Sequence, residues 1–331
     1  MTGTALPVGV VGVGSLGFHH ARILRDVPGA ELVGVYDADP ARAARVSEEL
    51  GVRAFPALED LLARVEAAVI AVPTTEHAAV ALAALERGVH LLIEKPIAST
   101  LEEADRIVAA ADAQGVTVAT GHVERFNGAL RACEPYLDVP RFVESHRLAP
   151  FAPRGTDVAV VLDLMIHDID LVLSLVGSEV SSVQAVGVPI LTPNVDIANA
   201  RLEFENGAVA NITASRVSME RTRKIRLFQP SGYLSLDLAK GTGEFLRLRR
   251  DAAQLLMQGD LSGLSLDRVV ERVELVGDGV EPLRAELEAF VKAVRGEGEV
   301  VVSGHDGRRA LAVALEIMQR IEHHVTGWKA P

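Results

Sequence analysis

A glycine-rich turn near the start of the chain constrains its fold more than any other feature. A GxGxxG pattern runs from Gly12 to Gly17, directly after the apolar run 8–13 and at the start of an expected helix. In such a unit the glycines permit a tight turn, close approach of a pyrophosphate and close helix–strand packing, and the anion lies at the helix N-terminus. The turn therefore predicts a dinucleotide site whose backbone contacts come from Gly12, Gly14, Ser15, Leu16 and Gly17.

The first third of the chain alternates between two patterns. Unbroken apolar runs, typical of strands buried on both faces of a parallel sheet, occupy residues 8–13, 32–35, 68–72, 89–93 and 116–119. Helix-forming stretches lie between them at 21–26, 41–50, 76–87 and 101–114, and the Ser-Thr-Leu-Glu at 99–102 predicts a capping box. We therefore expect an α/β, doubly wound parallel-sheet (Rossmann) domain over residues 1–121.

The pattern changes after residue 121. Alternating runs flank Asn206-Gly207, which is the strongest short hairpin signal, and the expected strands are 142–147, 197–204, 208–215, 224–228, 233–238 and 269–275. Helical stretches are expected at 157–176, 283–295 and 307–324. Residues 122–331 are thus predicted to form an α+β domain with an open, mostly antiparallel sheet and helices on one face.

Composition excludes several classes of function. The formal net charge is −12, which disfavours binding to nucleic acid or to an anionic membrane surface. The single cysteine, Cys133, excludes an intrachain disulfide and fits a reducing compartment. Residues 1–17 lack the basic segment of a secretory signal, and no apolar run is long enough to span a membrane. We expect a cytoplasmic protein.

Asp37 indicates which dinucleotide is bound. It follows the run 32–35 and lies 20 residues beyond Gly17. A carboxylate at this place accepts hydrogen bonds from the adenosine ribose and repels a 2′-phosphate, which favours NAD over NADP. Two observations leave room for other interpretations. Asp37 is also in place to cap the following helix, and Arg42 and Arg45 are suited to a 2′-phosphate.

Further cofactor contacts are expected at the carboxyl end of the run 68–72, because ligands of open α/β sheets bind at this edge. Pro73, Thr74 and His77 follow that run. We expect all three to contact the cofactor. The alternatives are that Thr74 or Thr75 caps the next helix and that His77 is a surface histidine.

Glu94-Lys95-Pro96 follows the run 89–93 at the same edge. A lysine that emerges from a buried strand is unusual, because lysine is rarely buried without a purpose. Pro96 stiffens the turn and is compatible with a cis peptide bond. Lys95 is therefore a candidate functional residue.

The GxGxxG domain, the Glu-Lys-Pro and the α+β second domain together resemble the glucose–fructose oxidoreductase/inositol dehydrogenase (Gfo/Idh/MocA) family over nearly the whole chain. The resemblance implies an NAD-dependent dehydrogenase in which Lys95 contacts both the nicotinamide region and the reacting hydroxyl, with Glu94 beside it in the cofactor site. It also implies that the second domain binds substrate and pairs sheets face to face in a homodimer or homotetramer.

A second constellation lies in the expected helix 157–176. Asp163 and His167 are four residues apart, so they project from one helical face. The family resemblance implies that His167 is an acid/base residue or substrate ligand and that Asp163 orients a sugar hydroxyl. One alternative is a solvated polar face. Another is a metal site that adds Asp170, although no known ligand motif is present and hydride transfer needs no metal.

Oxidising a secondary alcohol requires a group that takes the hydroxyl proton. A neutral His167 meets this need, and so does Lys95 if burial and a neighbouring positive charge lower its pKa. A protonated lysine would instead stabilise a developing alkoxide. We expect His167 to accept the hydroxyl proton. Lys95 is expected to position the hydroxyl and to stabilise negative charge on its oxygen.

The Gly-His-Val-Glu-Arg-Phe-Asn at 121–127 resembles a branch of the family that includes UDP-N-acetylglucosamine 3-dehydrogenases. This implies oxidation at the 3-hydroxyl of a UDP-N-acetylhexosamine, with Arg125 and Asn127 as substrate contacts. Alternatively, Arg125 pairs with a nearby carboxylate and Asn127 caps the next helix. The competing functions are an inositol or free-sugar dehydrogenase and a non-catalytic NAD-binding sensor.

Overall fold

The computed structural model describes residues 5–152, 158–249 and 269–326, and the chain forms two compact units. The first comprises Met1–Phe126 and Glu281–Ala312, and the second comprises Asn127–Val280 and Val313–Pro331. This division differs from the expected single boundary at residue 121, because a C-terminal stretch returns to the first unit. An amphipathic helix pattern does not specify which sheet covers its apolar face, so the return could not be predicted.

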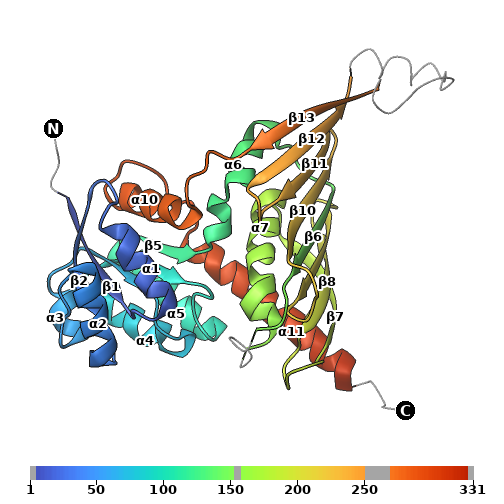
Figure 1. Ribbon diagram of the computed structural model, residues 1–331. Coiled ribbons are helices and arrows are strands. Elements are labelled where there is room, and N and C mark those ends of the chain that lie inside the picture. The colour runs from blue at the N-terminus through green and yellow to red at the C-terminus, as the bar shows by residue number, and fades with distance from the viewer. Residues whose placement is uncertain (1–4, 153–157, 250–268, 327–331) are drawn as a thin grey trace. The chain divides into compact units, whose positions relative to one another are not determined.

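The first unit contains a parallel sheet, as predicted (Figure 1). Its five strands are β1 (Leu6–Val11), β2 (Ala30–Tyr36), β3 (Ala67–Ile70), β4 (His90–Glu94) and β5 (Val118–Gly121). Their order is β2-β1-β3-β4-β5, so the chain steps to one side of β1 for β2 and to the other side for β3. The switch point between β1 and β3 is where ligands of open α/β sheets bind.

Helices connect these strands: α1 (Ser15–Leu24), α2 (Pro40–Leu50), α3 (Leu58–Leu62), α4 (Thr74–Leu85) and α5 (Leu101–Gln114). The short α3 was not predicted. The capping box of α5 joins Thr100 to Glu103, one residue later than expected. Pro73 precedes α4 and no side chain caps this helix, so the interpretation of Thr74 or Thr75 as a cap is wrong.

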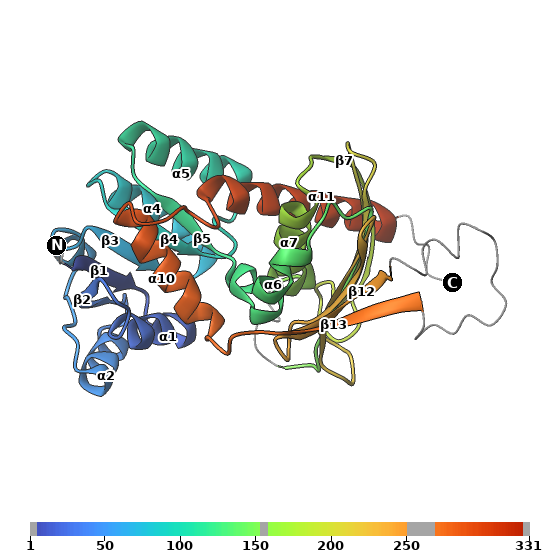
Figure 2. The same ribbon diagram turned by 90° about the horizontal axis from the view of Figure 1, so that it is seen from above.

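The returning helix α10 (Pro282–Val294) belongs to the core of the first unit. Leu287, Phe290 and Val291 are buried in one cluster with side chains of β1 and α1. Figure 2 shows α10 beside α1. The long helix α11 (Gly304–Thr326) follows, and the boundary between the units falls within it.

The second unit contains an eight-stranded open sheet in the order β13-β12-β11-β10-β6-β9-β8-β7. Its strands are β6 (Phe142–Leu148), β7 (Val180–Val188), β8 (Ile197–Phe204), β9 (Val209–Ser215), β10 (Thr222–Gln229), β11 (Gly232–Asp237), β12 (Thr242–Leu248) and β13 (Val270–Val276). Among the described strands of this sheet, only β6 and β9 pair in parallel. The mostly antiparallel sheet is confirmed, whereas β7 and β12 were not predicted.

Helices α6 (Gly128–Cys133) and α7 (Ile166–Val176) lie on one face of this sheet (Figures 1 and 2). A 3-10 turn, Val123–Phe126, ends the first stretch of the first unit, and another, Glu134–Tyr136, follows α6. A π-helical segment, Val161–Met165, leads into α7. The expected start of this helix at residue 157 lies outside the described residues.

A buried ion pair holds α7 against the sheet. Arg147 Nε of β6 donates to Asp168 Oδ2 at 2.5 Å, and Ser145 Oγ donates to Asp168 Oδ1 at 2.7 Å. Breaking such a pair leaves an uncompensated buried charge, so the orientation of α7 depends on this contact. Among the described helices, none combines the length and apolarity needed to cross a lipid bilayer.

The assignment of α10 to the first unit can be tested with Phe290→Ala. Phe290 is 3% exposed, so its truncation should destabilise the first unit by about 3–5 kcal/mol. In hydrogen exchange, protection should fall in β1 and α1 and remain in β8 and β9. Phe151→Ala is the control, because that ring is 44% exposed. Loss of protection in β8 and β9 instead would contradict the assignment.

Candidate cofactor and active site

The GxGxxG turn has the predicted strand–turn–helix form. Gly12 has a φ of +82°, and a Cβ there would lie 2.7 Å from Val72 N. A Cβ on Gly17 would lie 1.8 Å from the carbonyl oxygen of Gly12. Both glycines are therefore required by the close passage of β1, α1 and the end of β3.

The N-terminus of α1 is suited to an anion. Gly14 is the N-cap and supplies no side chain to the first-turn amides. Ser15 and Leu16 form this first turn, and Leu16 is 43% exposed. A Cβ built on Gly14 would meet no atom within 4 Å. The positive helix end and the open space at Gly14 together fit a pyrophosphate.

Asp37 follows β2 directly and is 7% exposed. Its Oδ2 accepts from Val13 N at 2.8 Å, its Oδ1 accepts from Asp39 N at 2.8 Å, and Arg42 Nη1 lies 3.1 Å from Oδ1. The cap of α2 is Asp39, whose carboxylate accepts from two first-turn amides. The interpretation of Asp37 as the cap is therefore wrong. Its bond to Val13 N holds the carboxylate beside the GxGxxG turn.

A cavity of about 680 Å³ opens at the switch point and is within the range of small-molecule sites. It is lined by residues at and after the carboxyl ends of β1, β2 and β3: Val11, Gly12, Gly14, Tyr36, Asp37, Ala38, Asp39, Arg42, Leu58, Ala71, Val72, Pro73, Glu76 and Val80. Pro73 lies in this wall, as expected. Tyr36, Leu58 and Val80 were missed, because apolar lining residues carry no motif. The arrangement fits the adenosine and pyrophosphate portions of NAD.

Thr74 is half-buried in the first turn of α4, while His77 is turned into the protein and is 1% exposed. His77 Nδ1 lies 2.9 Å from the carbonyl oxygen of Pro96, and Nε2 lies 3.0 Å from that of Val72. Burial lowers the pKa of His77, although both carbonyls raise it. A neutral ring donates to one of the two carbonyls. In place of a polar face toward the cofactor, His77 links the ends of β3 and β4.

Lys95 is half-buried at the end of β4, between Glu94 and Pro96, which are buried. The Lys95-Pro96 bond is cis. Glu94 is 7% exposed, and its Oε2 accepts from Lys95 N at 3.1 Å. Its Oε1 lies 2.7 Å from Nε2 of His20, which is fully buried on α1. His20 was missed by sequence reasoning, since a histidine within a helix has no motif of its own.

Asp163 and His167 lie on adjoining helical segments of the second unit. Asp163 belongs to the π-helix and His167 to the first turn of α7. Both are half-buried, whereas Asp168 and Asp170 are buried. Single π turns are frequent at functional sites. In the described part of the chain, no three His, Cys, Asp or Glu side chains are grouped as metal ligands.

Arg125 belongs to the first unit, and Asn127 is the first residue of the second unit. Arg125 is half-buried in the 3-10 turn. Asn127 is 5% exposed and caps α6, since its Oδ1 accepts from Ala129 N at 3.0 Å. Its Nδ2 donates to the carbonyl oxygen of Leu238 at 2.8 Å. The alternative interpretation of Asn127 as a helix cap is confirmed.

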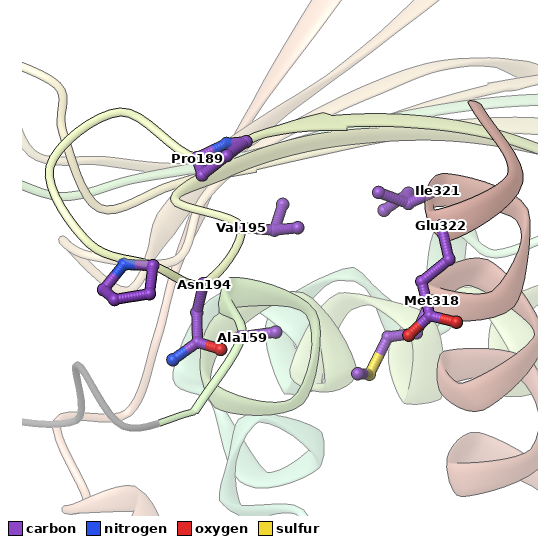
Figure 3. A pocket seen from close by; sticks show the side chains of 8 residues that line it. Ala159, Pro189, Asn194, Val195, Met318, Ile321 and Glu322 are labelled. Atoms are coloured by element: carbon purple, nitrogen blue, oxygen red, sulfur yellow. The ribbon is translucent and has the colours of Figure 1, made fainter. Parts of the chain in front are cut away.

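The second unit has a cavity of its own, of about 370 Å³. Figure 3 shows mainly apolar side chains around it, with Glu322 as the charged residue of the wall. It is lined by Ala159, Pro189, Pro193, Asn194, Val195, Met318, Ile321 and Glu322. None of the predicted site residues belongs to this wall.

Comparisons with known proteins agree with this geometry. A model of the Gfo/Idh/MocA oxidoreductase family, NAD-binding Rossmann fold, matches residues 6–122, and a model of the GFO/IDH/MocA C-terminal domain matches residues 128–235. The chain is 41% identical over 315 residues to UDP-N-acetylglucosamine 3-dehydrogenase of Acidithiobacillus ferrooxidans, covering 95% of this chain and 96% of that protein.

Two further relatives extend the comparison. A solved structure of a UDP-N-acetylglucosamine 3-dehydrogenase from the same organism has a TM-score of 0.87 at 38% identity, covering 96% of this chain and 98% of that chain. The NAD(+)-dependent scyllo-inositol 2-dehydrogenase of Bacillus subtilis is 31% identical over 230 residues, covering 63% of this chain and 67% of that protein.

Gly14→Ala should separate folding from cofactor binding. The added methyl group meets no protein atom, so the Tm should stay within about 2 °C, since surface substitutions usually cost under 0.5 kcal/mol. The methyl group would fill the space assigned to the pyrophosphate. NADH affinity, measured by fluorescence titration, should fall at least about tenfold, or 1.4 kcal/mol. Unchanged affinity would mean that the cofactor does not approach this turn.

Substitutions of Asp37 and Arg42 test which residues determine the preference for NAD over NADP. Asp37→Ser removes the charge that repels a 2′-phosphate and releases Arg42 to bind it, so the ratio of NADP to NAD affinity should rise by about tenfold or more, because like-charge contacts cost several kcal/mol. The double variant Asp37→Ser/Arg42→Ala should lose most of this gain. Equal ratios in both variants would exclude Arg42 as a phosphate ligand.

Proposed function

Because the chain belongs to the Gfo/Idh/MocA family of NAD-binding oxidoreductases, we propose that it transfers a hydride between NAD and a secondary hydroxyl carbon of a sugar. The observation that carries this proposal is the amine of Lys95, which follows the buried Glu94 at the ligand edge of the parallel sheet. NAD, when bound, accepts the hydride. The rest of the reaction requires groups that bind the alcohol and take its proton.

Lys95 is proposed to position the reacting hydroxyl and to stabilise negative charge on its oxygen. An ammonium group provides three donors and a full positive charge, which suits a developing alkoxide. Glu94 and Pro96 flank it as buried neighbours, so the main chain at Lys95 is closely held. A defined amine position is what hydride transfer from a particular carbon requires.

His167 is proposed to take the hydroxyl proton, and Asp163 to orient a neighbouring sugar hydroxyl. The half-buried state of both side chains supports this, because it leaves part of each surface open to a ligand. Asp168, one residue beyond His167, is already committed to Arg147 and carries no role in the reaction. A neutral imidazole is an effective general base.

The proposed substrate is a UDP-N-acetylhexosamine, oxidised at its 3-hydroxyl. The 41% identity to UDP-N-acetylglucosamine 3-dehydrogenase over 95% of the chain supports this choice. Arg125 is the proposed substrate contact of the 121–127 stretch, while Asn127 contributes by capping α6. A second candidate is an inositol or free-sugar dehydrogenase, which the 31% identity to scyllo-inositol 2-dehydrogenase favours.

We further propose a cytoplasmic homodimer or homotetramer. One cysteine in 331 residues agrees with a reducing compartment. On the sheet of the second unit, Phe142, Phe228 and Tyr233 form a ladder with ring centroids 5.5 and 4.7 Å apart, and Phe228 is 39% exposed. A partly exposed aromatic row of this kind is suited to a subunit contact.

Lys95→Met tests the mechanism. Met retains the apolar stem and removes the charge, so NADH binding should persist while kcat falls by about 10²–10⁴-fold. The assay is NADH formation with UDP-N-acetylglucosamine, and inositols and free hexoses form the comparison panel. Turnover that survives in Lys95→Met would remove Lys95 from the mechanism. If the unmodified protein binds NADH but turns over no member of the panel, the alternative function of a non-catalytic NAD-binding sensor would be favoured.

A further inference from the structure

Two buried groups of the first unit contact each other, and one of them is the chain neighbour of Lys95. One is the imidazole of His20, which is 0% exposed, on the buried side of α1. The other is the carboxylate of Glu94, the last residue of β4. His20 Nε2 and Glu94 Oε1 are 2.7 Å apart. A short contact between two buried ionisable groups beside a candidate catalytic lysine requires an explanation.

The direction of the hydrogen bond follows from the ionisation of Glu94. Burial raises the pKa of this carboxyl, but the hydrogen bond from His20 and the charges of His20 and Lys95 outweigh burial and leave the pKa below its usual range. An ionised carboxylate only accepts hydrogen bonds. With Glu94 ionised, the proton of this contact belongs to His20 Nε2, and Glu94 Oε1 accepts the hydrogen bond.

The second carboxylate oxygen is also committed. Glu94 Oε2 accepts from the backbone N–H of Lys95 at 3.1 Å. On the β5 side, a Cβ added to Gly121 would lie 3.0 Å from Glu94 Cδ and Oε2. Glycine at this position lets β5 pack directly against the carboxylate. The Glu94 side chain is thus held between α1, the backbone of Lys95 and β5.

We infer that His20 and Glu94 are positioning residues that hold the main chain of Lys95 in a fixed place relative to α1. The inference rests on the proposed role of Lys95. Helix α1 begins at the GxGxxG turn, which binds the pyrophosphate. The His20–Glu94 contact therefore connects the helix that receives the cofactor to the residue that meets the alcohol.

This arrangement predicts a specific kinetic effect. His20 is fully buried and does not line the cofactor cavity, so its loss should leave cofactor affinity nearly intact. A displacement of about 1 Å at a reacting group costs up to about 100-fold in rate. The effect should therefore appear in kcat and not in the affinity for NADH.

His20→Ala is the first variant. We expect kcat to fall by at least about tenfold, while the Kd for NADH changes less than threefold. His20→Gln should recover most of the rate, because its amide nitrogen reaches about as far as Nε2 and can donate to Glu94. The double variant His20→Ala/Glu94→Ala should be no slower than Glu94→Ala, since His20 acts through Glu94.

Val8→Ala is the control for general loss of stability. Val8 is fully buried in β1 of the same unit, so its truncation should lower the Tm without a change in kcat. A His20→Gln variant as slow as His20→Ala would overturn the inference, because the hydrogen-bond donor would then be irrelevant.

A measurement independent of turnover uses the small number of lysines. The chain has five, at positions 95, 224, 240, 292 and 329. After reductive methylation with ¹³C-formaldehyde, the Lys95 signal is identified by its absence from Lys95→Met. In His20→Ala this signal should move while the other four stay, and in Val8→Ala none should move.

The two proposals fail in different ways. An unchanged Lys95 signal and unchanged kcat in His20→Ala, with Lys95→Met inactive, would overturn the positioning role and leave the proposed function intact. Active Lys95→Met would remove Lys95 from the mechanism, and NADH binding without turnover by the unmodified protein would overturn the proposed function itself. A signal that moves together with a reduced kcat at constant NADH affinity supports the positioning role.

Discussion

All strands of a parallel sheet end at the same edge, and the functional part of the first unit depends on this constraint. The ends of β1, β2 and β3 supply the GxGxxG turn, Asp37 and Pro73 to one cavity. The end of β4 supplies Lys95. Backbone amides at this edge have no strand partner, so they bind the side chains placed there. Val13 N, for example, donates to Asp37 and Lys95 N donates to Glu94.

Polar residues among the predicted site positions and their neighbours differ in burial and in the contacts they make. His77 and Asn127 are almost fully buried, and their polar atoms contact backbone groups. Asp168 is neutralised by Arg147. Such groups must be satisfied internally because an unpaired buried polar atom is costly. Asp163 and His167, which we propose meet the substrate, remain half-buried on adjoining helical segments.

Local patterns predicted most of the architecture. All five strands of the first sheet, the hairpin at Asn206-Gly207 and the helix at 101–114 follow from side-chain periodicity and turn chemistry. Strands β7 and β12 were not predicted, because polar residues and glycines interrupt the alternation of apolar and polar side chains in them. The π turn before α7 was also missed, since its residues differ little from those of an ordinary helix. Motifs pointed to the GxGxxG turn, Asp37 and Lys95 as site residues, but they gave no sign of the apolar residues that line the cavity beside the turn.

The sequence by itself determined the class of fold, the dinucleotide turn and the chemical groups available for hydride transfer, because these depend on neighbouring residues. Tertiary structure alone decided which distant groups meet. It brought His20 to Glu94 across 74 positions of the chain and α10 back onto the first unit. The physical reason is that burial selects partners by shape and charge after the elements have packed, and no local pattern records that choice.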